Sequence, residues 1–163
     1  MKNLLDDVKP GICIALMILL FGGGLGITFN FIDEDIESYI ENQVAAHPEL
    51  HDEKSADKIW RLWQRAHFHA MGISAFTLAL IGLTALADMR SGVKRLVSVL
   101  ISMGGLYSVA WFVMALLAPG IGKSAAHEAV SVNIITALAI GSLSTGGGLL
   151  FTNIFFGVFS SRI

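Results

Sequence analysis

The amino-acid sequence predicts an all-α integral membrane protein, a four-transmembrane-helix bundle with an amphipathic helix on its outer surface. Of the 163 residues, 54% are hydrophobic and only 15% are charged, whereas a soluble domain has about 25% charged residues. Nine of the 13 acidic residues lie between Asp33 and Asp57, which leaves long stretches nearly free of charge. We therefore expect a single membrane domain over residues 1–163, in contact with the lipid bilayer.

Four segments are long and apolar enough to cross a bilayer. A hydrocarbon core about 30 Å thick needs roughly 20 consecutive apolar residues in a helix. The segments that meet this requirement are about residues 11–29, 66–87, 93–117 and 129–159. The first is longer than the roughly 7–15 apolar residues of a signal peptide, so we expect it to span the membrane as well.

The basic residues predict how the spans are oriented. The short connection 88–95, between the second and third spans, carries three of them, and the positive-inside rule places such a connection in the cytoplasm. Four spans then put both termini on the cytoplasmic side, where Lys2, Lys9 and Arg162 agree with the rule. We expect both termini to be cytoplasmic.

The outer segment 32–65 has the pattern of an amphipathic helix followed by the start of the second span. Asp33 can cap the helix, acidic residues fill its polar face, and His47-Pro48 ends it. Trp60 and Trp63 then begin a helix that we expect to continue unbroken into the membrane. The apolar residues at helical spacing in the first part are Ile32, Ile36, Tyr39, Ile40 and Val44.

Glycines form three clusters inside the spans, at 22–24 with 26, at 104–105 and at 146–148. Small residues allow membrane helices to approach closely, because packing drives helix association in lipid. A broken helix that lines a cavity is the alternative interpretation.

All five histidines fall on the predicted outer side, and three of them lie at span boundaries. His67 and His69 stand at the outer end of the second span, and His127 precedes the fourth. Polar and ionisable groups at membrane depth are costly, so they are functional candidates. Residues two apart on a helix point about 200° apart, so only one of His67 and His69 can face the inside of the bundle.

These histidines predict a cofactor site near the outer face. His69 and His127 are candidate axial ligands of a haem b iron, because such ligation needs side chains from two helices at one depth. A quinone head group, held by His or Tyr hydrogen bonds, is the alternative cofactor. Tyr107, Trp111 and Met114 of the third span complete the predicted cluster, with Asn30 and Asn133 at similar levels. Aromatic and His residues are also ordinary at a membrane boundary.

Several other kinds of function are excluded or disfavoured. The lone Cys13 excludes a disulfide framework and an iron–sulfur cluster held by this chain alone. A net charge of −2 without a basic cluster argues against a nucleic-acid partner. The chain has none of the phosphate-binding or nucleophile motifs of soluble enzymes. We therefore do not expect an enzyme acting alone, although a subunit of a membrane oxidoreductase is compatible.

One segment resembles a known group of proteins. The sequence RAHFHAMGISAFTLALIGLTAL, residues 65–86, is similar to the His-x-His helix opening of small uncharacterised bacterial membrane proteins related to the catalytic subunit of haem-copper oxidases. The resemblance rests on Ala66, His67, His69 and the apolar helix after them. It implies a bacterial cytoplasmic membrane and a haem ligand at His67 or His69. The remaining histidines of an oxidase core are absent.

Three functions remain open from the sequence. The first is a subunit for electron transfer that binds haem b or quinone and works with other membrane or outer-side electron-transfer subunits in a hetero- or homo-oligomer. The second is a structural or assembly subunit of a larger membrane complex. The third is a small transporter, whose polar path would use Asn133, Ser142, Ser144, Thr145 and Asn153 of the fourth span.

Overall fold

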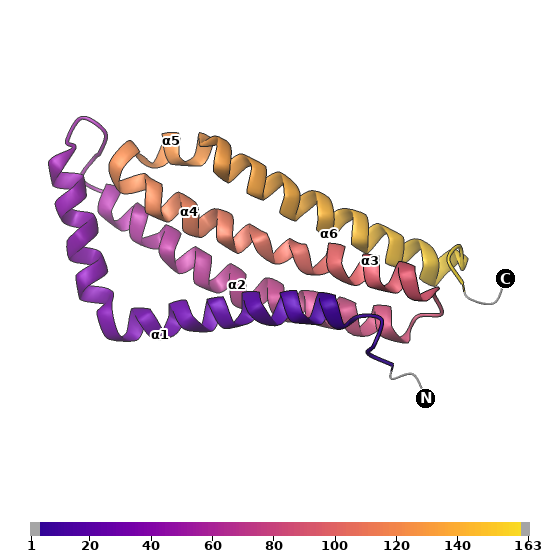
Figure 1. The fold of residues 1–163 in the computed structure, drawn as a ribbon. Coiled ribbons are helices and arrows are strands. Elements are labelled where there is room, and N and C mark those ends of the chain that lie inside the picture. The colour runs from indigo at the N-terminus through magenta and orange to yellow at the C-terminus, as the bar shows by residue number, and fades with distance from the viewer. Residues whose placement is uncertain (1–3, 161–163) are drawn as a thin grey trace.

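A computed structural model describes residues 4–160 and shows an all-helical chain, with no strand in that range. Four of its rods are long and apolar enough to span a membrane: α1, α2, the continuous α3–η1–α4 unit and α6. These match the four predicted spans, and both termini lie at the same end of the bundle (Figure 1). Lys2 and Arg162, used above for orientation, lie outside the described residues. The elements are α1 (Lys9–Ala46), α2 (Ser55–Leu86), α3 (Ser91–Ser102), the 3₁₀ turn η1 (Met103–Gly105), α4 (Leu106–Ile121), α5 (Lys123–Glu128) and α6 (Val130–Phe156).

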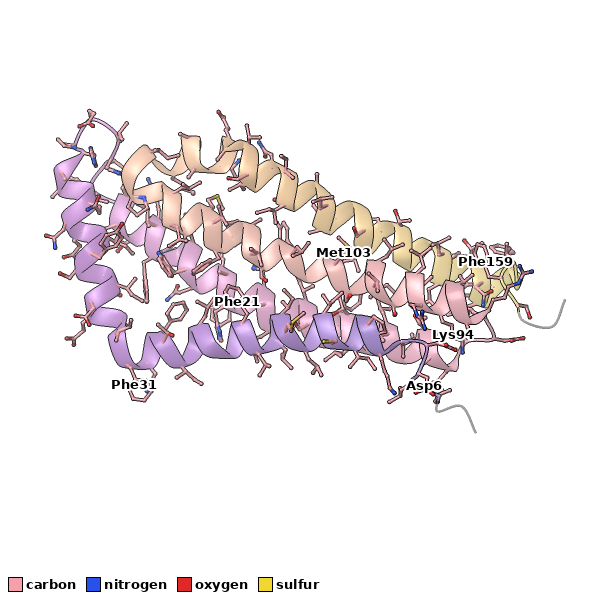
Figure 2. The ribbon with its side chains drawn as sticks, viewed as in Figure 1. Asp6, Phe21, Phe31, Lys94, Met103 and Phe159 are labelled. Atoms are coloured by element: carbon pink, nitrogen blue, oxygen red, sulfur yellow. The ribbon has the colours of Figure 1, made fainter. Side chains whose placement is uncertain are left out.

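Helix α1 contains both the first span and the amphipathic segment, joined by a bend at Ile32. The bend residue has φ −137° and ψ 25°, and the part of α1 beyond it crosses the end of the bundle (Figure 1). We call this the loop end, and the opposite end the termini end. At the bend, Phe31 points away from the bundle (Figure 2). The predicted amphipathic helix is therefore present across one end of the molecule.

Two residues of the predicted apolar face are placed differently. Ile40 is buried against α2 and α4, with Ile36 and Val44 packed partly against the same cluster. Ile32 and Tyr39, in contrast, are 42% and 49% exposed. The bend changes the direction of the chain at Ile32, and the contact with the bundle centres on Ile40, so a straight-helix pattern drawn through all five residues is wrong for these two.

The boundaries of the spans also differ at their ends. As expected, α2 runs without a break from Ser55 through Trp60 and Trp63 into the apolar segment. Helix α6 ends at Phe156, before the predicted 159, because Gly157 adopts a left-handed conformation with φ 64° and its N–H bonds to the Asn153 carbonyl. That glycine turn is the common C-terminal stop signal of a helix.

The bundle is open on one side. Helices α1, α2 and the α3–α4 rod pack against one another, whereas α6 packs against α3, η1 and α4. Among residues 4–160, α6 shares no interface of similar extent with α1 or α2, and it lies across the α3–α4 rod from α1 (Figure 1). A surface groove therefore separates α2 from α6, and the α3–α4 rod forms its floor.

One glycine or more in each cluster mediates a close helix contact. A Cβ atom at Gly22 would lie 2.7 Å from Ala70 Cβ, and one at Gly146 would lie 2.9 Å from the Ile101 nitrogen. Both glycines sit in unbroken helices, which supports the close-packing interpretation there. Gly104 and Gly105 differ, because they fall in the 3₁₀ turn that interrupts the third span.

Candidate functional site

His67 of α2 faces α1 and makes contacts that join the two helices. Its Nδ1 donates to the Gly22 carbonyl over 2.8 Å, and its ring lies edge-on to Phe29 at 6.0 Å between centroids. Gly26 makes room for the imidazole, since a Cβ there would lie 2.7 Å from His67 Cε1. His67 therefore has a structural task between α1 and α2, away from the other predicted site residues.

His69 faces α4, as expected for a residue two positions from His67. Its ring stacks on Trp111, with centroids 5.5 Å apart and planes at 28°, and meets the Tyr107 ring edge-on at 5.3 Å. Its Nδ1 donates to the Arg65 carbonyl over 2.8 Å. The Arg65 guanidinium lies 5.0 Å from the Trp111 ring centroid, so His69, Arg65 and two aromatic rings form one cluster.

A small cavity lies beside this cluster, between α4, α5 and α6. Its volume is about 60 Å³. It is lined by Tyr107, Ala110, Trp111, Met114, His127, Val132 and Thr136. We call it the head cavity. It gathers four of the six predicted site residues, and His69 stacks on the Trp111 ring that forms part of its wall.

The chain between α4 and α6 brings His127 to this cavity. Gly122 has φ 80° and ψ 152°, a conformation that only glycine adopts at low cost, and it turns the chain from α4 into α5. Ala126 of α5 is fully buried in the apolar cluster at the loop end. His127, the next residue, borders the head cavity while its ring stays exposed at the loop end.

The polar groups around the head cavity lack partners. Within residues 4–160, no group forms a hydrogen bond with the Tyr107 hydroxyl, the Thr136 hydroxyl or the His127 ring, and Trp111 Nε1 is buried without an acceptor. Five other hydroxyls in the spans bond to backbone carbonyls three or four residues earlier, those of Thr77, Thr84, Ser98, Ser102 and Ser108. Away from the cavity, Ser74 Oγ and Trp63 Nε1 are also buried without a partner among the described residues. Of the four groups around the head cavity, Trp111 Nε1 is buried, and an unpaired donor in an apolar setting costs free energy. The other three are partly or fully exposed, so they are accessible to a ligand with matching polar atoms.

The size of the head cavity bears on which cofactor fits. Sites that enclose a cofactor or drug-sized ligand have volumes of about 300–1,000 Å³, whereas this cavity holds about 60 Å³. This volume is smaller than either a haem or a complete quinone requires, so enclosing either cofactor needs α4 and α6 to move apart. No group of three or more His, Cys, Asp or Glu side chains among the described residues is arranged to hold a metal ion.

A wide, shallow cleft of about 900 Å³ lies at the loop end, next to the head cavity. In it, His51 Nε2 donates to the Pro119 carbonyl over 2.9 Å. This bond ties the α1–α2 loop to the last turn of α4, where carbonyls lack helical partners. His47 lies 3.4 Å from a Glu49 carboxylate oxygen. His47 and His51 therefore hold the loop end together and do not enter the head cavity.

Thr136 lines the head cavity but was not predicted from the sequence as a site residue, whereas Asn133 and Asn30 were predicted near the site and do not line the cavity. Asn133 is exposed and donates to the Glu128 carbonyl over 3.1 Å, and Asn30 is exposed. The helical spacing of Val132, Thr136, Ala139 and Leu143 is the signal that identifies the inward face of α6.

The polar residues proposed for a transport path make local contacts. The Asn153 amide donates to the Asp88 carbonyl over 3.0 Å, and its oxygen accepts from the Phe159 N–H over 2.9 Å. Ser142 Oγ lies 3.9 Å from Met103 Sδ. The Asn153 bonds hold the chain together at the termini end, and Ser142 contacts the third span. Neither contact supports the transporter interpretation.

No protein-family model, curated protein or solved structure matches this chain. The function is therefore argued from the geometry of the head cavity.

Proposed function

We propose that this chain is an integral membrane subunit for electron transfer that binds a quinone head group in the head cavity. The observation that carries the proposal is that the buried Trp111 Nε1, the Tyr107 and Thr136 hydroxyls and the His127 ring surround one cavity and have no hydrogen-bond partner among residues 4–160. A quinone ring has two carbonyl oxygens that accept hydrogen bonds. Such a ligand supplies the acceptors that these donors lack.

The aromatic wall suits a flat ring. Tyr107 and Trp111 present their rings to the cavity, with Met114 between the helices, and aromatic pairs prefer stacked or edge-on contacts. His69 and Arg65 support the Trp111 ring from outside the cavity. In this proposal His69 is a positioning residue, because it acts on the ligand through Trp111.

The same residues can serve the proton chemistry of a quinone. Reduction to the quinol takes up two electrons and two protons, which converts both carbonyl oxygens to hydroxyls. Tyr and His side chains can donate to the carbonyl and accept from the hydroxyl. The exposed His127 ring connects the cavity to water at the loop end, so it is suited to pass protons between the ligand and water.

The electrons have to come from, or go to, another protein. We propose a partner membrane subunit or outer-side electron-transfer protein, in a hetero- or homo-oligomer located in a bacterial cytoplasmic membrane with both termini inside. Haem b stays a second possible cofactor only if α4 and α6 separate on binding it. A reduced-minus-oxidised visible spectrum of the purified protein tests that directly.

A structural or assembly subunit is the alternative function, and one observation favours it. Three of the five histidines, His51, His67 and His69, donate to backbone carbonyls within the chain. Histidines used in this way stabilise helix packing and leave no more than one ring nitrogen for other chemistry.

Quinone titration separates the two functions. In the purified full-length protein, a short-chain benzoquinone should quench tryptophan fluorescence saturably. Tyr107→Phe and Thr136→Val each remove one hydroxyl, and each should weaken binding about tenfold, the effect of losing about 1.4 kcal/mol. Thr145→Val, on the exposed part of α6, is the control and should bind as the wild type does. Absence of saturable binding to the wild-type protein would leave the structural role as the better account.

A further inference from the structure

A second cavity shares Tyr107 with the head cavity and lies nearer the middle of the bundle. Its volume is about 110 Å³. Its lining consists of Ile73 of α2, Gly104 of η1, Tyr107 of α4, and Ala139, Ile140 and Leu143 of α6. Tyr107 borders both cavities. We call the second one the tail cavity, and apart from the Tyr107 hydroxyl its side chains are apolar.

The two cavities lie one after the other along the length of α4 and α6. On α4 and η1 the lining runs from Met114 through Tyr107 to Gly104, a length of about 15 Å at 1.5 Å per residue. On α6 it runs from Val132 to Leu143 in the same direction. Met103, next to Gly104, lies about midway along the bundle (Figure 2). The polar part therefore faces the loop end, and the apolar part lies deeper in the predicted membrane.

Small residues shape the floor of the tail cavity. Gly104 lies under Leu143, whose Cβ and Cδ2 would both be 3.1 Å from a Cβ atom placed on that glycine. Ala139 is 1% exposed. The groove stays open between them because α2 and α6 do not pack together on this face.

We infer that the ligand of this protein is a long-chain quinone whose isoprenoid tail lies in the tail cavity while its head occupies the head cavity. This inference rests on the proposed function. It goes further by naming the class of quinone and by assigning Ile140, Ile73 and Leu143 to the recognition of its tail. The shared lining residue Tyr107 and the change from polar to apolar lining with depth match a molecule that has a polar ring and an apolar chain.

The test compares two benzoquinones with the same ring, one without a chain and one with a ten-carbon chain. Each is titrated into the full-length protein in nanodiscs of fixed lipid composition. Ile140→Trp fills the tail cavity, and Leu138→Trp is the matched control, because both positions are about half exposed on α6 but only Ile140 lines the cavity. Ile140→Phe serves as a milder second variant.

We expect the chain to tighten binding at least tenfold in the wild type and in Leu138→Trp. In Ile140→Trp this advantage should fall below threefold, while affinity for the chainless quinone stays unchanged, which also shows that the variant is folded. An equal chain advantage in both Trp variants means that the chain only partitions into lipid, and it overturns the inference while the proposed function stands. If neither quinone binds the wild type, both the inference and the proposed function are wrong.

Discussion

Two histidines separated by one residue have different tasks because helix geometry directs them to different neighbours. His67 bonds to the Gly22 carbonyl of α1, whereas His69 stacks on Trp111 of α4 beside the head cavity. The sequence predicts that the two side chains diverge. It does not predict which one faces α4, because that depends on how α2 is rotated in the bundle.

Gly26 gives a residue-scale prediction about the His67 contact. Gly26→Ala places a Cβ 2.7 Å from His67 Cε1 and should destabilise the protein by about 1–3 kcal/mol, the usual cost of overpacking. Gly23→Ala, in the same helix with nothing within 4 Å of the new Cβ, should be neutral or stabilising, since alanine favours helices. Thermal unfolding in detergent measures both. Equal stability of the two variants contradicts the described packing of His67.

Asp52 gives a second residue-scale prediction, on pH. Hydrogen bonds from Lys58 Nζ at 2.6 Å and then from Ser55 Oγ at 2.8 Å lower the pKa of Asp52 from 3.8 to about 2. A lowered pKa means that the charged carboxylate favours the folded state at neutral pH, and that this contribution is lost as the pH falls from 3.8 through about 2.

An NMR titration of the Asp52 carboxyl carbon measures this shift. The midpoint should be about 2 in the wild type and should move toward 3.8 in Lys58→Met, which removes the donor that contributes most. Lys54→Met is the control, because Lys54 donates through its backbone N–H. A wild-type midpoint near 3.8 contradicts the described hydrogen bonds to the Asp52 carboxylate.

At the scale of elements, the turn from α4 into α5 positions His127 without touching a ligand. Gly122→Ala forces a side chain into a conformation with φ 80°, which costs about 1–3 kcal/mol or displaces α5. We expect quinone affinity to fall at least fivefold. Gly120→Ala, in the last turn of α4 with open space around it, should leave affinity unchanged, and the titration described above distinguishes the two.

The helices are predictable from the length and hydropathy of their segments, whereas the details of how they bend and pack are less so. The four spans and the crossing helix are predictable because bilayer thickness and helical spacing constrain them. A change of direction near Ile32 is expected from Asp33 as a helix start, but a bend inside one continuous helix is not, since neither glycine nor proline marks it. Thr136 was predictable, because it shares the helical spacing of Val132, Ala139 and Leu143. The extended Ala129 between α5 and α6, with ψ 134°, was not. Tyr107, Trp111 and Met114 were predictable as a group because their spacing places them on one face of α4.

At the scale of the whole molecule, the open side of the bundle determines what the protein can bind. Helices α1 and α2 and the α3–α4 rod form the packed core, and α6 packs mainly against the α3–α4 rod. This arrangement leaves a groove that is polar near the loop end and apolar toward the middle of the bundle. A closed four-helix bundle would bury these faces against each other. The proposed function therefore depends on the peripheral position of α6 as much as on any single side chain.

Photolabelling with an azidoquinone shows where a quinone binds without assuming which residues matter. The full-length protein in nanodiscs is irradiated with the probe, digested and mapped by mass spectrometry. The account predicts saturable labelling of α4 near Tyr107 and Trp111 and of the α5–α6 segment near His127 and Thr136, prevented by excess unlabelled quinone. Labelling that does not saturate, or that falls mainly on the outer faces of α1 and α6, would contradict it.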